Sequence, residues 1–110
     1  MKLNEIVEKL GLTIINRGKD FEREVTGGYT SDLLSDVMGN IDEDMLWITL
    51  QVHRNTIAVA SLKEIAGVVL IGDAKLDEDT LAQAKSEEVT VLATEMPAFE
   101  TSGRIYELIK

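Results

Sequence analysis

Three nearly continuous apolar runs constrain the fold of this chain more than any other feature of its sequence. They cover residues 45–50, 67–71 and 89–93, and polar or glycine residues bound each of them. Strands that are apolar on both faces are typical of parallel sheets covered by helices. Residues 55–65 and 77–87 lie between the runs and carry apolar side chains at helical spacing. Because parallel strands need crossover connections, the alternation predicts a largely parallel sheet with helices on both faces.

The two ends of the chain continue this pattern. Residues 3–10 have the spacing of an amphipathic helix, and Gly11 follows where a left-handed residue ends such a helix. Short strands are expected at 12–15 and from 24 onward, and Asp77 is the expected N-cap of the helix that it precedes. Pro97 is expected to open a last helix that carries four apolar residues inward: Phe99, Ile105, Tyr106 and Ile109. We therefore expect one α/β domain over residues 1–110, a three-layer α/β/α sandwich.

Charge and composition exclude several classes of partner. The 110 residues include 20 acidic and 11 basic ones, which gives a net charge of -9. Such a chain repels nucleic-acid phosphates and anionic membranes. It has no cysteine, and its longest apolar run is far shorter than a membrane span. We expect a cytoplasmic protein with no nucleic-acid partner, no membrane partner and no thiolate metal site.

A pair of glycines gives the strongest local signal for a binding site. The segment 26–32 reads Thr-Gly-Gly-Tyr-Thr-Ser-Asp and is predicted to form a turn between a strand and a helix over 31–38. Adjacent glycines at such a turn leave backbone N–H groups uncovered, and a helix start adds further unpaired N–H groups. This predicts a cradle for an anionic group. A simple strand–helix connector is the alternative.

Polar residues after the other strands extend the candidate site, because the carboxyl ends of parallel strands meet at one edge of a sheet. The predicted strand over 67–71 is followed by Gly72 and Asp73, and the one over 89–93 is followed by Thr94 and Glu95. His53 is the only histidine and could contact a ligand or respond to pH. The predicted ligand-binding residues are Thr26, Gly27, Gly28, Tyr29, Ser31, Gln51 and His53.

No catalytic or metal-binding motif accompanies this candidate site. The chain contains neither G-x-x-x-x-G-K-[ST] nor G-x-G-x-x-G, and no lysine follows the glycine pair to reach a phosphate. Asp32 and Asp36 would share one helical face and, with the acids at 42–44, could gather a divalent cation. The spacing lacks the alternating oxygen ligands of a calcium loop, so a solvated acidic face is the favoured interpretation. We expect no catalytic residue and no metal site, and the sequence leaves any cofactor unidentified.

Three segments resemble the DRTGG domain in its stand-alone form. They are 24–29, 31–39 and the strand 46–51, and the resemblance extends over nearly the whole chain. It implies a fold similar to the N-terminal domains of HPr kinase/phosphorylase and of the Mur ligases. The chain departs from the name motif, with Glu24 in place of aspartate and Val25 in place of arginine. An anion contact through that arginine is therefore not implied here.

The resemblance also implies an accessory, regulatory or dimerising role, with catalysis carried by other domains. We therefore expect a non-catalytic, homodimeric module that senses a nucleotide or phosphorylated metabolite at the Gly27-Gly28 turn. The helix carrying residues 57–62 supports a homodimer, because it is apolar on more of its circumference than one sheet face can cover. The alternative is a purely structural protein that docks on a larger metabolic enzyme.

Overall fold

The computed structural model describes all 110 residues and contains one five-stranded sheet. The strand order is β1-β5-β4-β3-β2. Strands β2 to β5 run parallel, and β1 joins the far side of β5 in the antiparallel direction. The expected largely parallel sheet is confirmed. The strands are β1 (Thr13–Asn16), β2 (Gly27–Thr30), β3 (Met45–Thr49), β4 (Gly67–Leu70) and β5 (Val91–Ala93).

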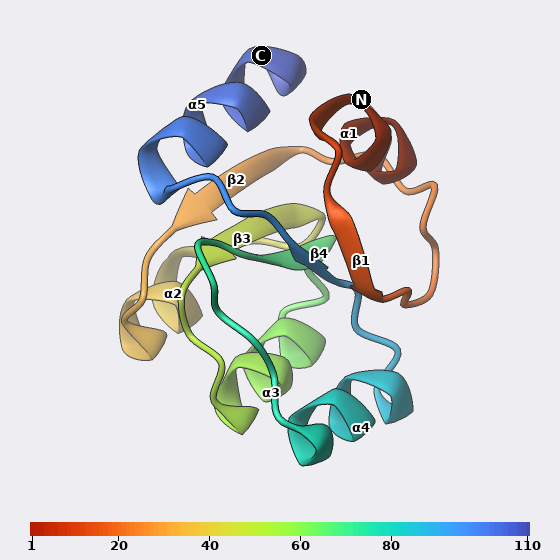
Figure 1. Ribbon diagram of the computed structural model, residues 1–110, viewed down its shortest axis with the longest axis vertical. Helices are drawn as coiled ribbons and strands as arrows, with labels where there is room; N and C mark the ends of the chain where they lie inside the picture. Colours follow the sequence, from red (N-terminus) through yellow and green to blue (C-terminus); the bar gives the residue numbers. More distant parts are fainter.

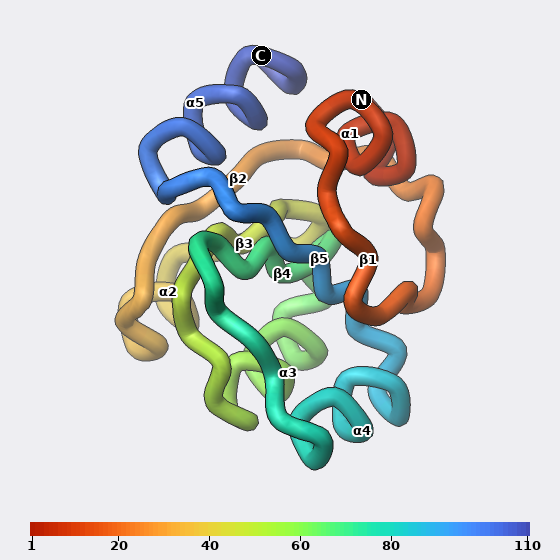
Figure 2. Tube along the Cα trace, in the orientation of Figure 1, coloured from red at the N-terminus to blue at the C-terminus, as the bar shows by residue number.

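Five helices cover the two faces of the sheet and complete the three-layer sandwich (Figure 1). Helices α1 and α5 lie side by side on one face, with the chain ends on that same side. The other three helices lie on the opposite face, as the crossovers between successive parallel strands in Figure 2. The helices are α1 (Leu3–Leu10), α2 (Leu34–Asn40), α3 (Arg54–Leu62), α4 (Glu78–Ser86) and α5 (Ala98–Ile109). None of these helices combines the length and the apolarity needed to cross a bilayer.

The apolar runs divide their side chains between two cores. Leu46 and Ile48 of β3 pack in the core beneath α1 and α5, whereas Trp47 packs in the core against α3 and α4. Val69 and Val68 of β4 alternate in the same way. Because successive residues of a strand point to opposite faces, a strand between two helical layers must be apolar at every position. This confirms the interpretation of the three runs as interior strands.

Two predicted helix boundaries are confirmed by their caps. Gly11 adopts a left-handed conformation (φ 62°) directly after α1. The Asp77 carboxylate accepts a hydrogen bond from the backbone N–H of Thr80 at 2.8 Å and so caps α4. Hydrogen bonds from Thr80 are the main cause that lowers the pKa of Asp77.

The predicted glycine turn is wrong, because Gly27 and Gly28 lie inside β2. They pair in register with Met45 and Leu46, and neither has a positive φ. A Cβ on Gly27 would lie 3.1 Å from the Met45 methyl carbon, and one on Gly28 would lie 3.5 Å from Ile48 Cδ1. Gly27 thus lies close to the end of the Met45 side chain, Gly28 has room for ordinary contacts, and neither forms a bare turn.

The helix after β2 begins later than predicted, at Leu34 and not near Ser31. The Asp32 carboxylate accepts hydrogen bonds from Thr49 and Leu50, which holds the preceding segment as a loop against the end of β3. Asp32 and Asp36 therefore do not share a helical face. Of the four apolar side chains in this region only Val37 is buried, while Leu33 and Met38 are exposed.

The inward face predicted for α5 is only partly correct. Ile105 is fully buried and Ile109 is half-buried, but Phe99 is 92 % exposed and Tyr106 is 64 % exposed. The helix rests on the sheet through Thr101 and Ile105. Because each residue turns a helix by about 100°, Ile105 and Tyr106 cannot both face the sheet squarely.

Candidate ligand-binding edges of the sheet

The seven predicted ligand-binding residues lie along β2 and its flanks and do not form one site. Thr26 precedes the amino end of β2, where its hydroxyl donates to the Glu43 carbonyl oxygen at 3.5 Å. Ser31 follows the carboxyl end of the same strand. At roughly 3.3 Å per strand residue, these two positions are about 16 Å apart. A single small ligand cradle cannot include both.

The carboxyl ends of β2 and β3 are joined by Asp32. Its Oδ1 accepts hydrogen bonds from the Thr49 hydroxyl at 2.7 Å and from the Leu50 N–H at 2.8 Å. The Gln51 amide donates to the Asp32 carbonyl oxygen at 2.9 Å. Ser31 is fixed beside it, because its carbonyl oxygen accepts from the Trp47 indole N–H at 2.8 Å. The structure thus brings Ser31 and Gln51 together through a residue that sequence reasoning had treated only as part of an acidic face.

His53 is the N-cap residue of α3. Its Nδ1 accepts a hydrogen bond from the Asn55 backbone N–H at 3.1 Å. In this arrangement the neutral ring carries its proton on Nε2, which is the nitrogen left for another partner. The role that the structure shows for His53 is to start α3 at the carboxyl edge.

Tyr29 points away from that edge toward α2. Its hydroxyl lies 2.9 Å from both carboxylate oxygens of Asp36, and this bond raises the pKa of Tyr29. Hydrogen bonding from Ser31 is the largest influence that lowers the pKa of Asp36, followed by that from Tyr29. The arrangement fixes α2 on β2, so Tyr29 has a packing role here.

The carboxyl-edge pocket lies beyond the ends of β4 and β5, next to β1. It has a volume of about 430 Å³ and is lined by Thr13, Ile15, Leu70, Gly72, Asp73, Ala74, Lys75, Leu76, Ala93, Thr94 and Glu95. Gly72 turns the chain after β4 with a left-handed backbone (φ 62°), and its N–H donates to the Met96 carbonyl oxygen at 3.4 Å. The turn after β4 is therefore tied to the end of β5.

Four polar side chains of the carboxyl-edge pocket have no partner within the protein. Thr13, Asp73, Lys75 and Glu95 form no intramolecular side-chain hydrogen bond and no ion pair. Asp73 and Glu95 had been noted in the sequence as polar residues after strands. Thr13 was not predicted, because nothing in the sequence places β1 beside β5. Lys75 was not predicted either, although it follows Asp73 by two residues in the connection between β4 and α4. The pocket thus offers both charges and an apolar surface to a ligand.

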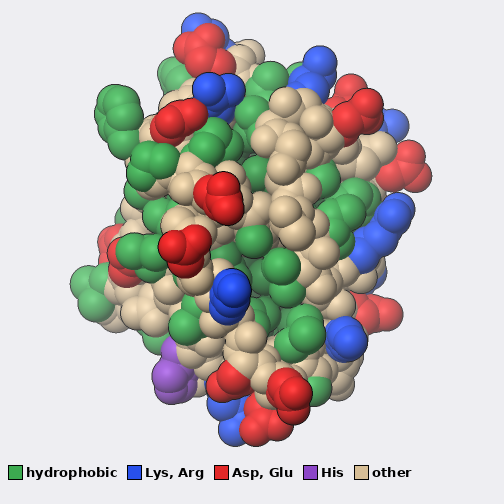
Figure 3. All heavy atoms as spheres, in the orientation of Figure 1, with side chains coloured by type: hydrophobic (Ala, Val, Ile, Leu, Met, Phe, Trp, Pro, Cys, Tyr) green, Lys and Arg blue, Asp and Glu red, His purple; other side chains and the backbone are tan.

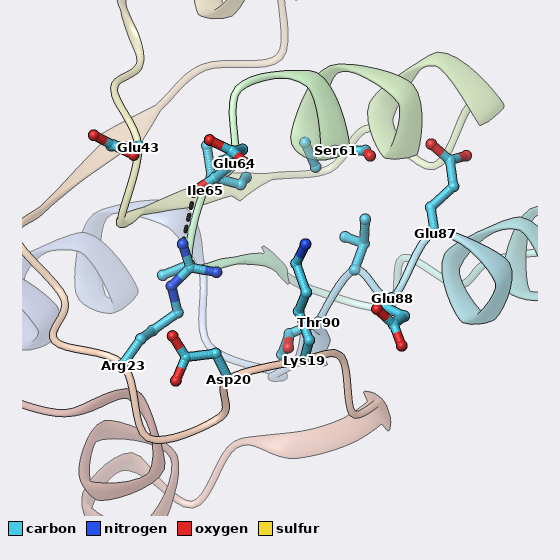
Figure 4. Close-up of a pocket in the computed structure, with 13 residues that line it drawn as sticks. Lys19, Asp20, Arg23, Glu43, Ser61, Glu64, Ile65, Glu87, Glu88 and Thr90 are labelled. Carbon is cyan, nitrogen blue, oxygen red and sulfur yellow. Dashed lines mark hydrogen bonds between the residues drawn. The ribbon is translucent and has the colours of Figure 1, made fainter.

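The amino-edge pocket, at the opposite edge of the sheet, is lined by more charged residues than the carboxyl-edge pocket (Figure 4). Its volume is about 290 Å³, and Lys19 and Arg23 lie among five acids: Asp20, Glu43, Glu64, Glu87 and Glu88. Arg23 Nη2 donates to Asp44 Oδ1 at 2.7 Å and to the Glu64 carbonyl oxygen at 2.8 Å. Figure 4 shows the Lys19 side chain extending into the cavity.

The backbone around the amino-edge pocket is locally strained. All four non-glycine residues with positive φ lie at this edge: Asp20, Asp44, Glu64 and Glu88. Gly18 is anchored there as well, since its N–H donates to the Thr90 hydroxyl at 3.0 Å, and Lys19 N–H donates to the Glu88 carbonyl oxygen at 3.2 Å. A non-glycine residue in this conformation costs about 1 kcal/mol or more. The contacts that hold it fasten the loop between β1 and β2 onto the sheet.

No group of three or more His, Asp or Glu side chains is arranged to hold a metal ion. The acids once considered together, Asp32, Asp36 and those at 42–44, are spread over both edges of the sheet. Asp32 and Asp36 are engaged at the carboxyl end of β2, and Asp44 pairs with Arg23 at the amino edge.

Comparisons with known proteins concern the family and the fold of the chain. The family model of the DRTGG domain matches residues 5–108. A solved structure with the same fold contains the CBS and DRTGG domains of the regulatory region of Clostridium perfringens pyrophosphatase, complexed with the activator diadenosine tetraphosphate. The TM-score is 0.73 at 17 % sequence identity, and the match covers 94 % of this chain and 45 % of that chain. No curated protein sequence matches.

Proposed function

Because this chain belongs to the DRTGG domain family, we propose that it is a non-catalytic regulatory module that binds a small ligand at the carboxyl edge of its sheet and acts as a homodimer. The pyrophosphatase region of the same fold is activated by a nucleotide, diadenosine tetraphosphate. This chain corresponds to under half of that region. A nucleotide is accordingly the ligand class that we propose for this protein.

The carboxyl-edge pocket is the observation that carries the proposal. Its volume of about 430 Å³ lies within the range of roughly 300–1,000 Å³ that is usual for small-molecule sites. It opens beyond the carboxyl ends of parallel strands, where open α/β sheets bind their ligands. Its four polar side chains without partners supply hydrogen-bonding groups that folding does not consume. The amino-edge pocket also has polar side chains without partners, but five acids lie there with two basic residues, which is less favourable for a phosphorylated ligand.

The chemistry of the pocket favours a ligand with an apolar ring and few negative charges. Ile15 and Leu76 offer apolar surface to a base, and the Lys75 ammonium offers a cation to a phosphate. Asp73 and Glu95 can accept hydrogen bonds from ribose hydroxyls or a base amino group. They also make the pocket's formal charge negative, so a polyphosphate would need an accompanying divalent cation.

The rest of the same edge adds predicted contacts. Ser31, Gln51 and His53 lie beyond the ends of β2 and β3, and their binding of a ligand stays a prediction. Gly27 and Gly28 are not part of the proposed contact, since the turn that motivated them is a strand. A site spread over β2 to β5 would suit a ligand longer than one nucleoside.

The non-catalytic role rests on how the reactive groups are used. The one histidine uses Nδ1 as a helix cap, and it has no hydrogen bond with a serine or threonine hydroxyl. Nucleophilic catalysis would need such a pair within hydrogen-bonding reach. The alternative function, docking on a larger enzyme, is favoured by the exposed apolar side chains of α2, α3 and α5.

Isothermal titration calorimetry with adenosine, AMP, ATP and diadenosine tetraphosphate, each with and without Mg²⁺, tests the ligand proposal. Lys75→Ala is expected to weaken binding of any phosphorylated member at least about tenfold, because the loss of a charged hydrogen bond is worth roughly 1.5–3 kcal/mol. Lys85→Ala, which removes an exposed lysine from the end of α4, is the matched control and should bind as the wild type does. Absence of heat with every nucleotide, or equal binding by Lys75→Ala, would contradict the proposal.

A further inference from the structure

We infer that the groove between the edge strand β2 and helix α5 is the surface on which a second copy of this chain docks. The inference rests on the homodimer part of the proposed function and makes no use of the ligand pocket. The groove has a volume of about 350 Å³ and is lined mainly by Gly28, Thr30 and Ile48 of the sheet and by the outer side of α5. β2 pairs with β3 alone, so its other side is an open sheet edge.

The exposed aromatic side chains of the protein are concentrated on this surface. The chain has five aromatic residues, and three of them, Trp47, Phe21 and Tyr29, are buried or half-buried. The other two, Phe99 and Tyr106, are the most exposed aromatics and both lie on α5. They are seven residues apart and therefore project from the same side of the helix. Apolar side chains projecting beside α5 are visible in Figure 3.

Gly103 lies between these two rings along the helix. A helix-interior glycine costs about 1 kcal/mol relative to alanine, and a Cβ built on Gly103 would have no neighbour within 4 Å. Nothing within one copy of the chain therefore requires glycine here. Gly103 leaves a gap between Phe99 and Tyr106 on the helix surface. The Tyr106 ring of one copy can lie over this gap in an antiparallel second copy.

The charges of α5 are also complementary to those of an antiparallel second helix. Glu100, Arg104, Glu107 and Lys110 alternate in sign along the helix and sum to zero, within a chain of net charge -9. Within one copy they form exposed pairs, Arg104 with Glu100 at 3.1 Å and Lys110 with Glu107 at 3.2 Å. Reversing the helix places Lys110 level with Glu100 and Glu107 level with Arg104. A two-fold axis would repeat both contacts, as a closed dimer requires.

The exposed rings of α5 supply about half of the area that a stable contact needs. A fully covered aromatic side chain buries roughly 150–250 Å². Covering the exposed parts of the four rings in a dimer would remove about 600 Å² from water, which is about half of the ~1,200 Å² at the lower end of specific interfaces. The groove between the two elements, which includes Ile109, is the surface from which the dimer would draw the remainder.

Sedimentation equilibrium at 1–100 µM protein tests the interface. The wild type is expected to have twice the 12.2 kDa chain mass, and Phe99→Glu and Tyr106→Glu are expected to be monomers. Leu62→Glu on α3 is the control, since Leu62 is 69 % exposed on the other apolar surface, and it should stay dimeric. All three side chains are exposed, so circular dichroism should show unchanged folding. A dimer lost in Leu62→Glu and kept in Phe99→Glu would overturn this interface but not the homodimer.

A charge exchange separates the intermolecular contact from helix stability. Glu100→Lys with Arg104→Glu keeps an opposite-charge pair within α5 but places like charges opposite Lys110 and Glu107 of the second copy. Dimerisation is expected to weaken about tenfold or more, and the further changes Glu107→Lys and Lys110→Glu should restore it. A wild type that is monomeric at 100 µM would overturn both the interface and the homodimer, and would assign the surface to a different protein. Nucleotide titration of the same sample reports separately on the ligand proposal.

Discussion

The two edges of the sheet differ in the charge of their pockets and in the strain of the backbone around them. At the amino edge, Arg23 bonds to Asp44 and to a backbone carbonyl, and Lys19 lies among acids on a strained backbone. At the carboxyl edge, the pocket beyond β4 and β5 has four polar side chains that bond to nothing in the protein. The amino-edge pocket is therefore the more acidic one and lies on a strained backbone, whereas the carboxyl-edge pocket has fewer charges and a larger share of apolar lining.

The largest loss of stability is expected when a side chain is added at Gly18, which lies closest to neighbouring backbone atoms at the amino edge. In Gly18→Ala, the new Cβ would lie 2.3 Å from the Glu88 carbonyl oxygen and 2.6 Å from the Thr90 nitrogen, both of them backbone atoms. Since neither atom can move without displacing β5, we expect a loss of about 3 kcal/mol in the free energy of unfolding. Urea denaturation measures it. Gly39→Ala is the control, because its Cβ would meet nothing within 4 Å.

A smaller loss is expected when the amino-edge ion pair is removed. The Arg23 side chain is only 15 % exposed, and in Arg23→Met its contacts with Asp44 and Glu64 disappear. Because hydrogen bonds to charged groups stabilise a folded protein, we expect a loss of about 2 kcal/mol in the free energy of unfolding. Arg104→Met removes an exposed pair and should cost below about 0.5 kcal/mol. Equal losses in the two variants would refute the contrast between paired and solvated charges.

Two exposed lysines provide a direct comparison of the edges. Lys19→Ala leaves five amino-edge acids without a nearby ammonium, so we expect a loss of about 1 kcal/mol at low salt that shrinks as salt rises. Lys75→Ala should change the free energy of unfolding by less than about 0.5 kcal/mol, because only two acids, Asp73 and Glu95, line its pocket. Thermal unfolding at 20 mM and 500 mM NaCl distinguishes them. A stability loss in Lys75→Ala as large as that in Lys19→Ala would show that the carboxyl edge also serves folding.

The smallest effect concerns acid sensitivity. Hydrogen bonds lower the pKa values of Asp36 and Asp77 in the folded chain. Each lowered pKa contributes stability above the ordinary aspartate value near 3.9, and this contribution is lost as pH falls toward the folded value. Asp36→Asn and Asp77→Asn should therefore reduce the decline in stability between about pH 5 and pH 2. Circular dichroism at a series of pH values measures the decline, and a decline as steep as that of the wild type would contradict this expectation.

One cooperative unit is a further expectation for residues 1–110. The two cores share every interior strand, so disrupting one should expose the other. Scanning calorimetry should show one transition whose calorimetric and van't Hoff enthalpies agree. Two resolved transitions would argue for separate domains.

Sequence patterns predict the layers of this fold because burial on both faces leaves a direct signature. Interior strands such as β3 and β4 must be apolar at every position, and Gly11 and Asp77 mark helix ends by local chemistry alone. The glycine pair of β2 carries no such signature. Adjacent glycines fit a turn or a strand equally well, and only the pairing of β2 with β3 decides between them.

Only some of the residues that line the carboxyl-edge pocket could be predicted from the sequence, for a related reason. Asp73 and Glu95 follow apolar runs, so their place at the carboxyl edge could be predicted. Thr13 joins them because β1 pairs with β5 in the antiparallel direction, across nearly eighty residues of chain. In α5, helical spacing alone could have shown that Phe99 and Tyr106 share a side that Ile105 does not.

The positions of α1 and α5 have a consequence for how this fold can be combined with others. Both helices lie on one face, and the chain enters and leaves the sandwich on the same side (Figure 1). Both ends of such a domain can therefore join the same region of a host protein, as domain insertion requires. A domain of this fold could then be inserted into a surface loop of another protein without separating the segments that flank the loop.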